Sequence, residues 1–243
     1  MAQLNVSGCV STGWEAFKKN AGTAIGIVVV YGVITSIGGV IPIVNVAVGL
    51  VVTPILSAGL AIFALKSARG GEGQIEDLFK GFSQDRFGSF LGAYWLLVLI
   101  VVAAFIPPLI GFGIDVAING GFANLFPYVT IAVSAFSLVA LVIAVLRFSM
   151  VTYLIIDGMM VMDAFRESAR ITKGFTGTLF LVILVNVSFV IAGILLLFMG
   201  LLVAMPLSML VYAAAYTKLK PEAPAAVQAA SPGGTPPPAA PGV

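Results

Sequence analysis

Long apolar runs separated by short basic clusters constrain this chain more than any other feature. A helix needs about 20 apolar residues to cross a hydrocarbon core about 30 Å thick. We expect six such spans, at about 22–40, 44–65, 87–106, 127–156, 175–199 and 201–217. Only 9% of the 243 residues are charged, against about 25% in average soluble proteins. The pattern therefore predicts an all-α, polytopic transmembrane helical bundle within residues 1–220.

The connections on one side of these spans carry almost no charge. Gly200 forms a tight turn before the last span. The third span should stop at Pro107-Pro108, because tandem prolines remove hydrogen-bond donors and bend the chain. The stretch that follows, 111–126, is predicted to be a connection with a single charge, Asp115.

The basic residues indicate how the spans are oriented. They cluster before the first span, between the second and third, between the fourth and fifth, and after the sixth: Lys18, Lys19, Lys66, Arg69, Lys80, Arg86, Arg166, Arg170, Lys173, Lys218 and Lys220. With an even number of spans, all these clusters fall on one side. The positive-inside rule places that side in the cytoplasm. We predict a multi-pass protein of the cell (inner) membrane with both termini cytoplasmic.

Three short charged segments share the order acid, small or apolar residue, Phe, base. They are Glu15-Ala16-Phe17-Lys18, Asp77-Leu78-Phe79-Lys80 and Asp163-Ala164-Phe165-Arg166, and each precedes a pair of spans. We interpret each as a short amphipathic helix along the cytoplasmic interface, with its aromatic side toward lipid and its charges in water. The chain is then predicted to contain three units, each an interfacial helix followed by a transmembrane hairpin.

Two finer patterns bear on the helices of these units. Thr12-Gly13-Trp14-Glu15 fits a capping box, so the first amphipathic helix should begin there. Pro54 lies twelve residues before Lys66, and Pro206 lies twelve residues before Lys218. Each proline falls in the second helix of a hairpin, where it either kinks the helix or frees a carbonyl that lines a cavity.

Arg147 is the one charged residue inside a predicted span. Counting from Pro127 places it near the cytoplasmic end, where the side chain can snorkel into the headgroups. Aligning Ser149-Met150 with Ser208-Met209 places it at mid-span instead, and the fourth run of about 30 residues allows either depth. Two interpretations remain open: snorkelling or structural pairing, and a ligand or lipid-headgroup site.

Polar residues elsewhere complete the set of candidates. Asn186 lies within the fifth span, where inter-helix hydrogen bonding commonly accounts for such a side chain. The full set of candidate functional or lipid-contact residues is Arg147, Asp157, Asp163, Arg166, Arg170 and Asn186.

Several kinds of chemistry lack the side chains they need. The chain has no histidine and one cysteine, Cys9, which excludes His-based acid–base catalysis, Cys–His nucleophiles and ordinary zinc sites. We therefore expect no metal, no cofactor and no catalytic activity. A net charge of +2 does not favour a nucleic-acid partner. Val6-Ser7-Gly8-Cys9 resembles a lipoprotein cleavage box, but no basic start or apolar stretch precedes it, so we expect an uncleaved N-terminus.

Small residues and biased composition give further expectations. Gly22 and Gly26 form a GxxxG pattern, and Ser57-Ala58-Gly59 forms a second small patch, both typical of close helix packing. Gly70-Gly71-Glu72-Gly73 lacks the Lys-Ser/Thr ending of a phosphate-binding loop and is interpreted as a flexible linker. Residues 221–243 are mostly Pro, Ala and Gly, which predicts a disordered cytoplasmic tail.

These motifs together resemble a known group of proteins. The similarity is to uncharacterised prokaryotic six-helix integral membrane families, which resemble the membrane domain attached to some glycerophosphodiester phosphodiesterases. It is carried by Gly13-Trp14-Glu15-Ala16-Phe17-Lys18-Lys19-Asn20, Pro54, Asp77-Leu78-Phe79, Tyr153-Leu154-Ile155-Ile156-Asp157 and the segment 163–170. The resemblance covers nearly all of the chain except the tail and implies a bacterial inner-membrane domain. It carries over no catalytic residue, because the matching positions include none of the metal-binding acids and histidines of the hydrolase.

These observations favour a non-enzymatic integral membrane protein, either a subunit of a membrane complex or a lipid-interacting scaffold. Its expected partners are membrane lipids, especially anionic headgroups, and other membrane-protein subunits. The alternative is a transporter or channel for a small solute or lipid that uses a cavity near Arg147. That alternative lacks an intramembrane carboxylate for proton coupling.

Overall fold

The structure, a computed structural model, describes residues 5–40, 46, 48–82, 84–118, 128–195 and 200–220. The expected tail, 221–243, and the start of the second expected span lie outside the described residues. In chain order the elements are α1 (Val6–Val40), the π-helix η1 (Val48–Val52), α3 (Thr53–Ala68), the 3₁₀-helix η2 (Ile75–Phe82), α4 (Gln84–Ile118), α5 (Tyr128–Phe148), α6 (Val151–Ile156), α7 (Val161–Ile171), α8 (Thr176–Leu195) and α9 (Leu201–Leu219).

The described part of the chain is helical and contains no strand. Six stretches are long and apolar enough to cross a membrane: Val6–Ser36, Val48–Ala68, Arg86–Ile118, Tyr128–Ile156, Thr176–Leu195 and Leu201–Leu219. The prediction of an all-α polytopic helical bundle with six candidate spans is confirmed. Which membrane it occupies, and which side faces the cytoplasm, remain predictions.

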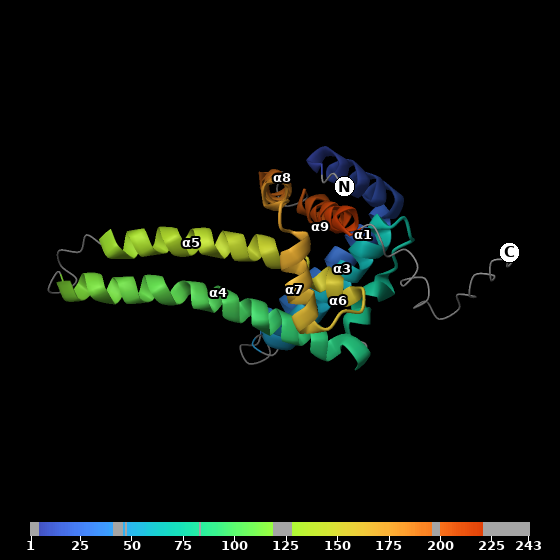
Figure 1. Ribbon diagram of the computed structural model, residues 1–243. Helices are drawn as coiled ribbons and strands as arrows, with labels where there is room; N and C mark the ends of the chain where they lie inside the picture. Colours follow the sequence, from blue (N-terminus) through green and yellow to red (C-terminus); the bar gives the residue numbers. More distant parts are fainter. Residues whose placement is uncertain are drawn as a thin grey trace, which may run out of the picture.

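The molecule has two regions, which we call the arm and the body. The arm is the pair α4 and α5, which lie side by side and project from the other described helices, the body (Figure 1). In the body α1 packs along α9, and α9 also contacts α3 and α8. The largest fully buried side chains of the body include Tyr216, Phe63, Ile27, Leu56, Leu78 and Leu154.

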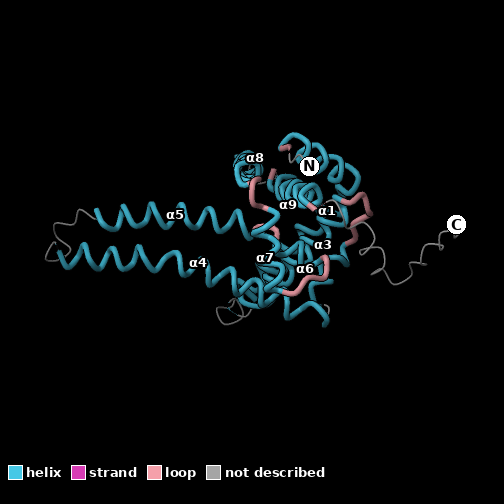
Figure 2. The backbone as a smooth tube through the Cα atoms, viewed as in Figure 1, coloured by secondary structure: helices cyan, strands magenta, loops and turns pink. Residues whose placement is uncertain are grey.

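The arm lies crosswise to α8. In Figures 1 and 2, α4 and α5 are seen along their length, whereas α8 is seen down its axis. Transmembrane helices tilt by at most about 40° from the bilayer normal. The arm and α8 can therefore cross the same flat bilayer only if the arm turns about its junction with the body.

The first helix begins earlier than expected. It starts at Val6, and the Asn5 side chain caps it by accepting the Ser7 N–H at 3.2 Å. The predicted capping box is therefore wrong, because Thr12 lies inside the helix and its hydroxyl donates to the Gly8 carbonyl at 2.9 Å. The helix is interrupted only at Asn20, which has non-helical angles of φ −119° and ψ 21°. This kink separates the first amphipathic segment from the apolar part that follows.

Helix α4, which contains the third expected span, does not stop at its tandem prolines. It runs through Pro107 and Pro108 to Ile118, so the predicted end there is wrong. Proline is tolerated inside apolar helices where neighbouring helices, hydroxyl side chains or local changes of helix winding compensate for the lost hydrogen bonds. Asp115, predicted to lie in a connection, is in the last turns of α4. Its buried carboxylate accepts the N–H groups of Val129 at 3.2 Å and Thr130 at 2.7 Å and so caps α5.

The fourth apolar run contains two helices. It is divided by a turn at Ser149 and Met150 into α5, of 21 residues, and the short α6. At about 1.5 Å per residue, α5 alone is about 31 Å long. Arg147 lies in the last turn of α5 with an exposed side chain, inside the candidate span Tyr128–Ile156, and its depth in the membrane stays a prediction.

All three acid–x–Phe–base segments form short helices before a long apolar helix. They lie in the first part of α1, in η2 and in α7. The second residue of each is buried and the base is exposed: Ala16, Leu78 and Ala164 face the protein, whereas Lys18, Lys80 and Arg166 face outward. The expected aromatic side is less uniform, because Phe17 is buried and stacks on Trp14 at 5.8 Å, whereas Phe79 is 46% exposed.

Close helix packing occurs at one of the two predicted small patches. A Cβ at Gly59 would lie 1.8 Å from the Leu78 carbonyl oxygen, so η2 rests directly on α3 there. Among the described residues, a Cβ at Gly22 would meet nothing within 4 Å and a Cβ at Gly26 would meet only the Ile75 side-chain end at 3.8 Å, so the GxxxG prediction is wrong for this part of the chain. Instead, α1 approaches α9 at Gly13, where a Cβ would lie 2.8 Å from the Val211 nitrogen.

Candidate functional site

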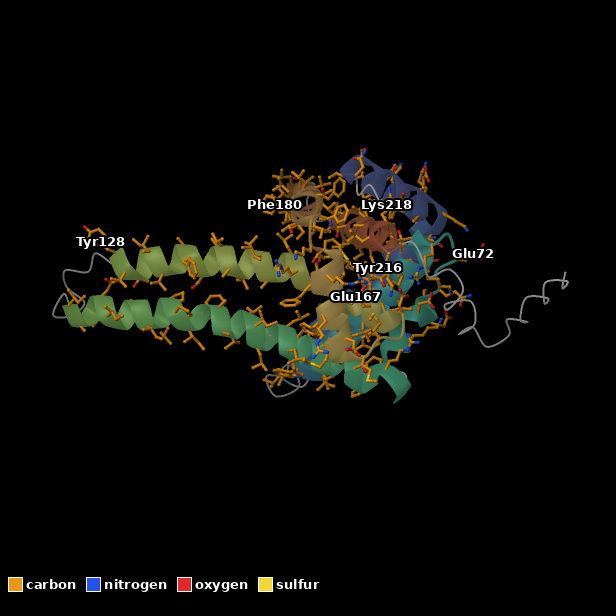
Figure 3. All side chains as sticks on the ribbon, viewed as in Figure 1. Glu72, Tyr128, Glu167, Phe180, Tyr216 and Lys218 are labelled. Atoms are coloured by element: carbon orange, nitrogen blue, oxygen red, sulfur yellow. The ribbon has the colours of Figure 1, made fainter. Side chains whose placement is uncertain are left out.

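A buried ion pair joins three body helices at their basic ends. The Arg69 Nη2 group donates to both oxygens of Asp157, at 2.9 and 3.0 Å, and the Tyr216 hydroxyl donates to the same carboxylate at 2.6 Å. The Asp157 side chain is 2% exposed, and the Tyr216 ring stacks on Tyr153 at 5.2 Å. Figure 3 shows Tyr216 in the interior of the body. Removing one partner would leave a buried charge unpaired, which makes this cluster a structural tie.

A second buried carboxylate holds η2 on α3. Asp77 accepts hydrogen bonds from Lys66 Nζ at 3.3 Å, from the Gln74 N–H at 2.9 Å and from Lys80 Nζ. Burial alone would raise the pKa of this carboxyl. The hydrogen bonds from Lys80 and Gln74, with the charges of Lys80 and Lys66, outweigh burial and hold its pKa below the ordinary value of 3.8.

The glycine-rich loop after α3 is tied to the kink in α1. Lys19 Nζ donates to the Gly70 carbonyl at 2.7 Å, and the Gly73 N–H donates to Asn20 Oδ1 at 3.1 Å. Gly70 has φ +85°, a conformation that glycine adopts without strain. The expectation of a flexible linker is therefore not met, since side chains from α1 hold both ends of this loop.

Helix α7 packs against the end of the arm, where it contacts the backbone carbonyl of Arg147. The Ser168 hydroxyl donates to the Arg147 carbonyl at 2.7 Å and accepts the Met150 N–H at 3.3 Å. The Phe148 and Phe165 rings pack with centroids 5.1 Å apart. The Arg147 side chain points away from this contact and is exposed.

A cavity of about 250 Å³ lies where the arm joins the body, between α3, α4, α6 and α9. We call it the junction cavity. Six of its lining residues carry hydroxyl groups: Ser57, Tyr94, Ser149, Thr152, Tyr153 and Tyr212. The other six are Pro54, Ala58, Ala61, Phe90, Ala93 and Leu97.

One wall of the junction cavity is shaped by a proline. Pro54 has no N–H for the Leu50 carbonyl, which an α-helix would bond four residues on. The chain is correspondingly wound as a π-helix just before it, at Val48–Val52. Pro54 itself lines the cavity, but Leu50, whose carbonyl it frees, is not among the lining residues, so the expectation that a freed carbonyl lines a cavity is not met here. Arg147 is not among the lining residues, so its side chain does not form part of this cavity.

The remaining candidates lie apart from this cavity. Asp163 pairs with Arg166 at 3.8 Å, and Glu167 pairs with Arg170 at 2.7 Å. The hydrogen bond from Arg170, together with its charge, lowers the pKa of the Glu167 carboxyl. Both arginines are exposed.

Asn186 does not make the inter-helix hydrogen bond expected of it. Its Oδ1 is buried without a hydrogen-bond partner among the described residues. It lies beside an apolar groove of about 260 Å³ between α8 and α9, which Tyr212 also lines.

Of the predicted candidates, only Asp157 enters a buried polar cluster, and reasoning from sequence missed its partners Arg69 and Tyr216. It named Ser57, Ser149 and Tyr153 in other patterns, but it did not identify the remaining hydroxyl residues of the cavity, which are Tyr94, Thr152 and Tyr212. One signal was available: Tyr212 and Tyr216 are four residues apart, so they share a face of α9. Such a pair in an otherwise apolar run indicates an internal polar face.

In comparisons with known proteins, no family model, no curated protein and no solved structure matches the chain.

Proposed function

We propose that this protein is a non-enzymatic, lipid-interacting scaffold of the bacterial inner membrane, with its basic end at the cytoplasmic face. The observation that carries the proposal is the common design of the three acid–x–Phe–base helices. Each buries its second residue against the fold and displays its base outward. Lys and Arg held at a membrane surface attract anionic headgroups, each by about 1 kcal/mol.

Exposed apolar side chains beside these bases support an interfacial position. Trp14 is 44% exposed near Lys18, and Phe79 is exposed next to Lys80. Met160 and Met162 are exposed at the start of α7, near Arg166. Amphipathic helices with this composition lie in the headgroup region, with apolar groups down and bases in the anionic layer.

The carboxylates of this end support a scaffold in preference to an enzyme. Asp77 and Asp157 each hold helices together through buried ion pairs, and Asp163 and Glu167 pair with arginines of their own helix. Carboxylates committed in this way stabilise the fold and are not poised to transfer protons. A subunit of a membrane complex would need a surface that recognises another protein. The exposed bases favour anionic lipid instead.

Retention of anionic lipid tests the proposal. The variant Lys18→Gln/Arg166→Gln leaves Lys80 in place, because Lys80 also holds the buried Asp77. The variant is reconstituted in bilayers of phosphatidylglycerol and phosphatidylcholine in equal amounts and purified, and bound lipid is counted by native mass spectrometry. We expect the variant to retain several-fold less phosphatidylglycerol than the parent protein, with phosphatidylcholine unchanged.

The control neutralises acids of the same segments. Glu15→Gln/Glu76→Gln removes two exposed carboxylates and should leave phosphatidylglycerol retention equal or higher. Equal retention by the lysine and arginine variant would contradict the proposal. Specific uptake of a solute by liposomes containing the pure protein would favour the transporter alternative over the scaffold.

A further inference from the structure

The junction cavity has a mixed lining that no step of the proposed function uses. None of its twelve lining residues is charged, and half of them carry a hydroxyl. Two cationic side chains near the ends of its helices are engaged elsewhere: Arg86 Nη1 donates to the Ile156 carbonyl, and Arg69 is paired with Asp157. The cavity therefore offers hydrogen bonds without a charge to balance a phosphate.

Its depth places it just inside the basic end. Phe90 follows Arg86 by four residues and Ser57 precedes Lys66 by nine, which is about 6 and about 14 Å along a helix. Headgroup layers occupy about 5–8 Å on each side of the hydrocarbon core. The cavity thus begins just below the level of phosphate groups and, at Ser57, reaches into the hydrocarbon core.

Several hydroxyls in the cavity are available to a ligand. No described residue hydrogen-bonds the hydroxyl of Tyr94, Thr152 or Tyr153. Ser57 makes only a long contact with the Tyr31 hydroxyl, 3.5 Å, and is exposed in the middle of α3, so the cavity opens sideways toward lipid. Polar groups that face hydrocarbon without partners are costly, which favours a bound molecule that pairs with them.

The size of the cavity limits what enters. About 250 Å³ is below the roughly 300–1,000 Å³ of pockets that enclose a whole drug-sized ligand. It suits the polar head of one lipid, whose chains leave through the side opening. A charged phospholipid head would have to give up its hydration without gaining a counter-charge.

We propose that the junction cavity binds the uncharged head of an acylglycerol, with diacylglycerol as the representative ligand. The Tyr94, Thr152 and Tyr153 hydroxyls donate to its ester carbonyls, and Ser57 meets its free hydroxyl at the opening. This site is distinct from the surface that attracts anionic headgroups, and neither proposal depends on the other.

The test uses the full chain reconstituted in nanodiscs with equal amounts of diacylglycerol and phosphatidylglycerol. Native mass spectrometry measures each bound lipid for the parent protein, for Ser57→Phe, which fills the cavity mouth, and for the matched control Ser188→Phe. Ser188 is likewise exposed in a span, but its hydroxyl bonds its own helix at the Leu184 carbonyl, outside the cavity. We expect Ser57→Phe to bind diacylglycerol at least tenfold more weakly and Ser188→Phe to bind it as the parent does.

Photo-crosslinking of the unaltered protein gives a second measurement that does not depend on a variant folding. A diacylglycerol with a diazirine near its ester groups should label peptides containing residues 54–61 and 90–97. Equal diacylglycerol binding by the two serine variants would overturn the inference. Labelling spread evenly over the arm, or retention of phosphatidylglycerol alone, would overturn it as well, and the latter result would still support the scaffold.

Discussion

The arm and the body are both apolar, yet they are built differently. In the body, small residues, buried ion pairs and tyrosine hydroxyls bring helices into close contact. The arm carries large apolar side chains that face outward: Leu109 is 71% exposed and Phe136 is 76% exposed. Apolar composition alone therefore says that a helix avoids water, but not whether protein or lipid replaces the water. Polar and small residues decide that, because they need specific neighbours.

The largest difference in stability between the two regions should come from truncation of a large side chain. Phe63 is 1% exposed in the body, and Phe63→Ala should cost about 3–5 kcal/mol through lost contacts and a cavity. Phe136→Ala in the arm should change stability by less than about 0.5 kcal/mol, since its side chain touches little protein. Denaturant unfolding in one detergent measures both. Similar losses would mean that the arm is packed against something as tightly as the body is.

Glycine substitution should give a smaller contrast with opposite signs. Gly59→Ala places a methyl group on the Leu78 carbonyl and should destabilise the body by about 1–3 kcal/mol. The methyl group of Gly113→Ala in the arm meets no described residue within 4 Å, and the variant should gain up to about 1 kcal/mol from helix propensity. The same unfolding measurement applies. A neutral Gly59→Ala would show that η2 can move away from α3 at little cost.

Loss of the Asp115 cap should act on the arm alone. Asp115→Ala removes the acceptor for the Val129 and Thr130 N–H groups and should cost about 0.5–2 kcal/mol. Hydrogen exchange followed by mass spectrometry should show faster exchange at the start of α5, with α3 and α9 unchanged. Faster exchange throughout the body would mean that the two regions unfold as one unit.

The smallest effect is expected in the pH dependence of the body. Asp77 has a pKa below 3.8 in the folded state, so its ion pairs stabilise the fold fully above the unfolded pKa. That contribution is lost as the pH falls below about 4 and through the folded pKa. Thermal unfolding of the parent at pH 3 to 7 should show this loss, and Asp77→Asn should flatten it. An unchanged profile in Asp77→Asn would assign the acid sensitivity to other carboxylates.

The sequence predicts the class of fold because the preference for lipid is local to each apolar run. It predicts helix ends less well, because several competing residues can cap: Asn5 caps α1 although Thr12 fits the pattern. Prolines also mislead, since α4 continues through Pro107 and Pro108, and neighbouring groups or small changes of winding can compensate for the hydrogen bonds that proline removes from an apolar helix.

The candidate site is harder to predict than the fold, because its partners are far apart in the chain. Arg69 and Asp157 are separated by 88 residues, and Asp157 and Tyr216 by 59. No pattern within a single helix encodes such a pairing. The four-residue spacing of Tyr212 and Tyr216 is the strongest local sign that a polar surface faces inward.

The two tryptophans of this chain fall at the two places with proposed functions. Trp14 stacks on Phe17 in the first amphipathic segment, and Trp95 contacts Tyr94, a wall of the junction cavity, edge to face at 6.0 Å. The molecule therefore carries one natural fluorophore for each lipid contact. In a Trp14→Phe variant the remaining emission comes from Trp95, which follows the cavity residue Tyr94 in α4, so a change in emission on adding diacylglycerol reports on this wall without any added label.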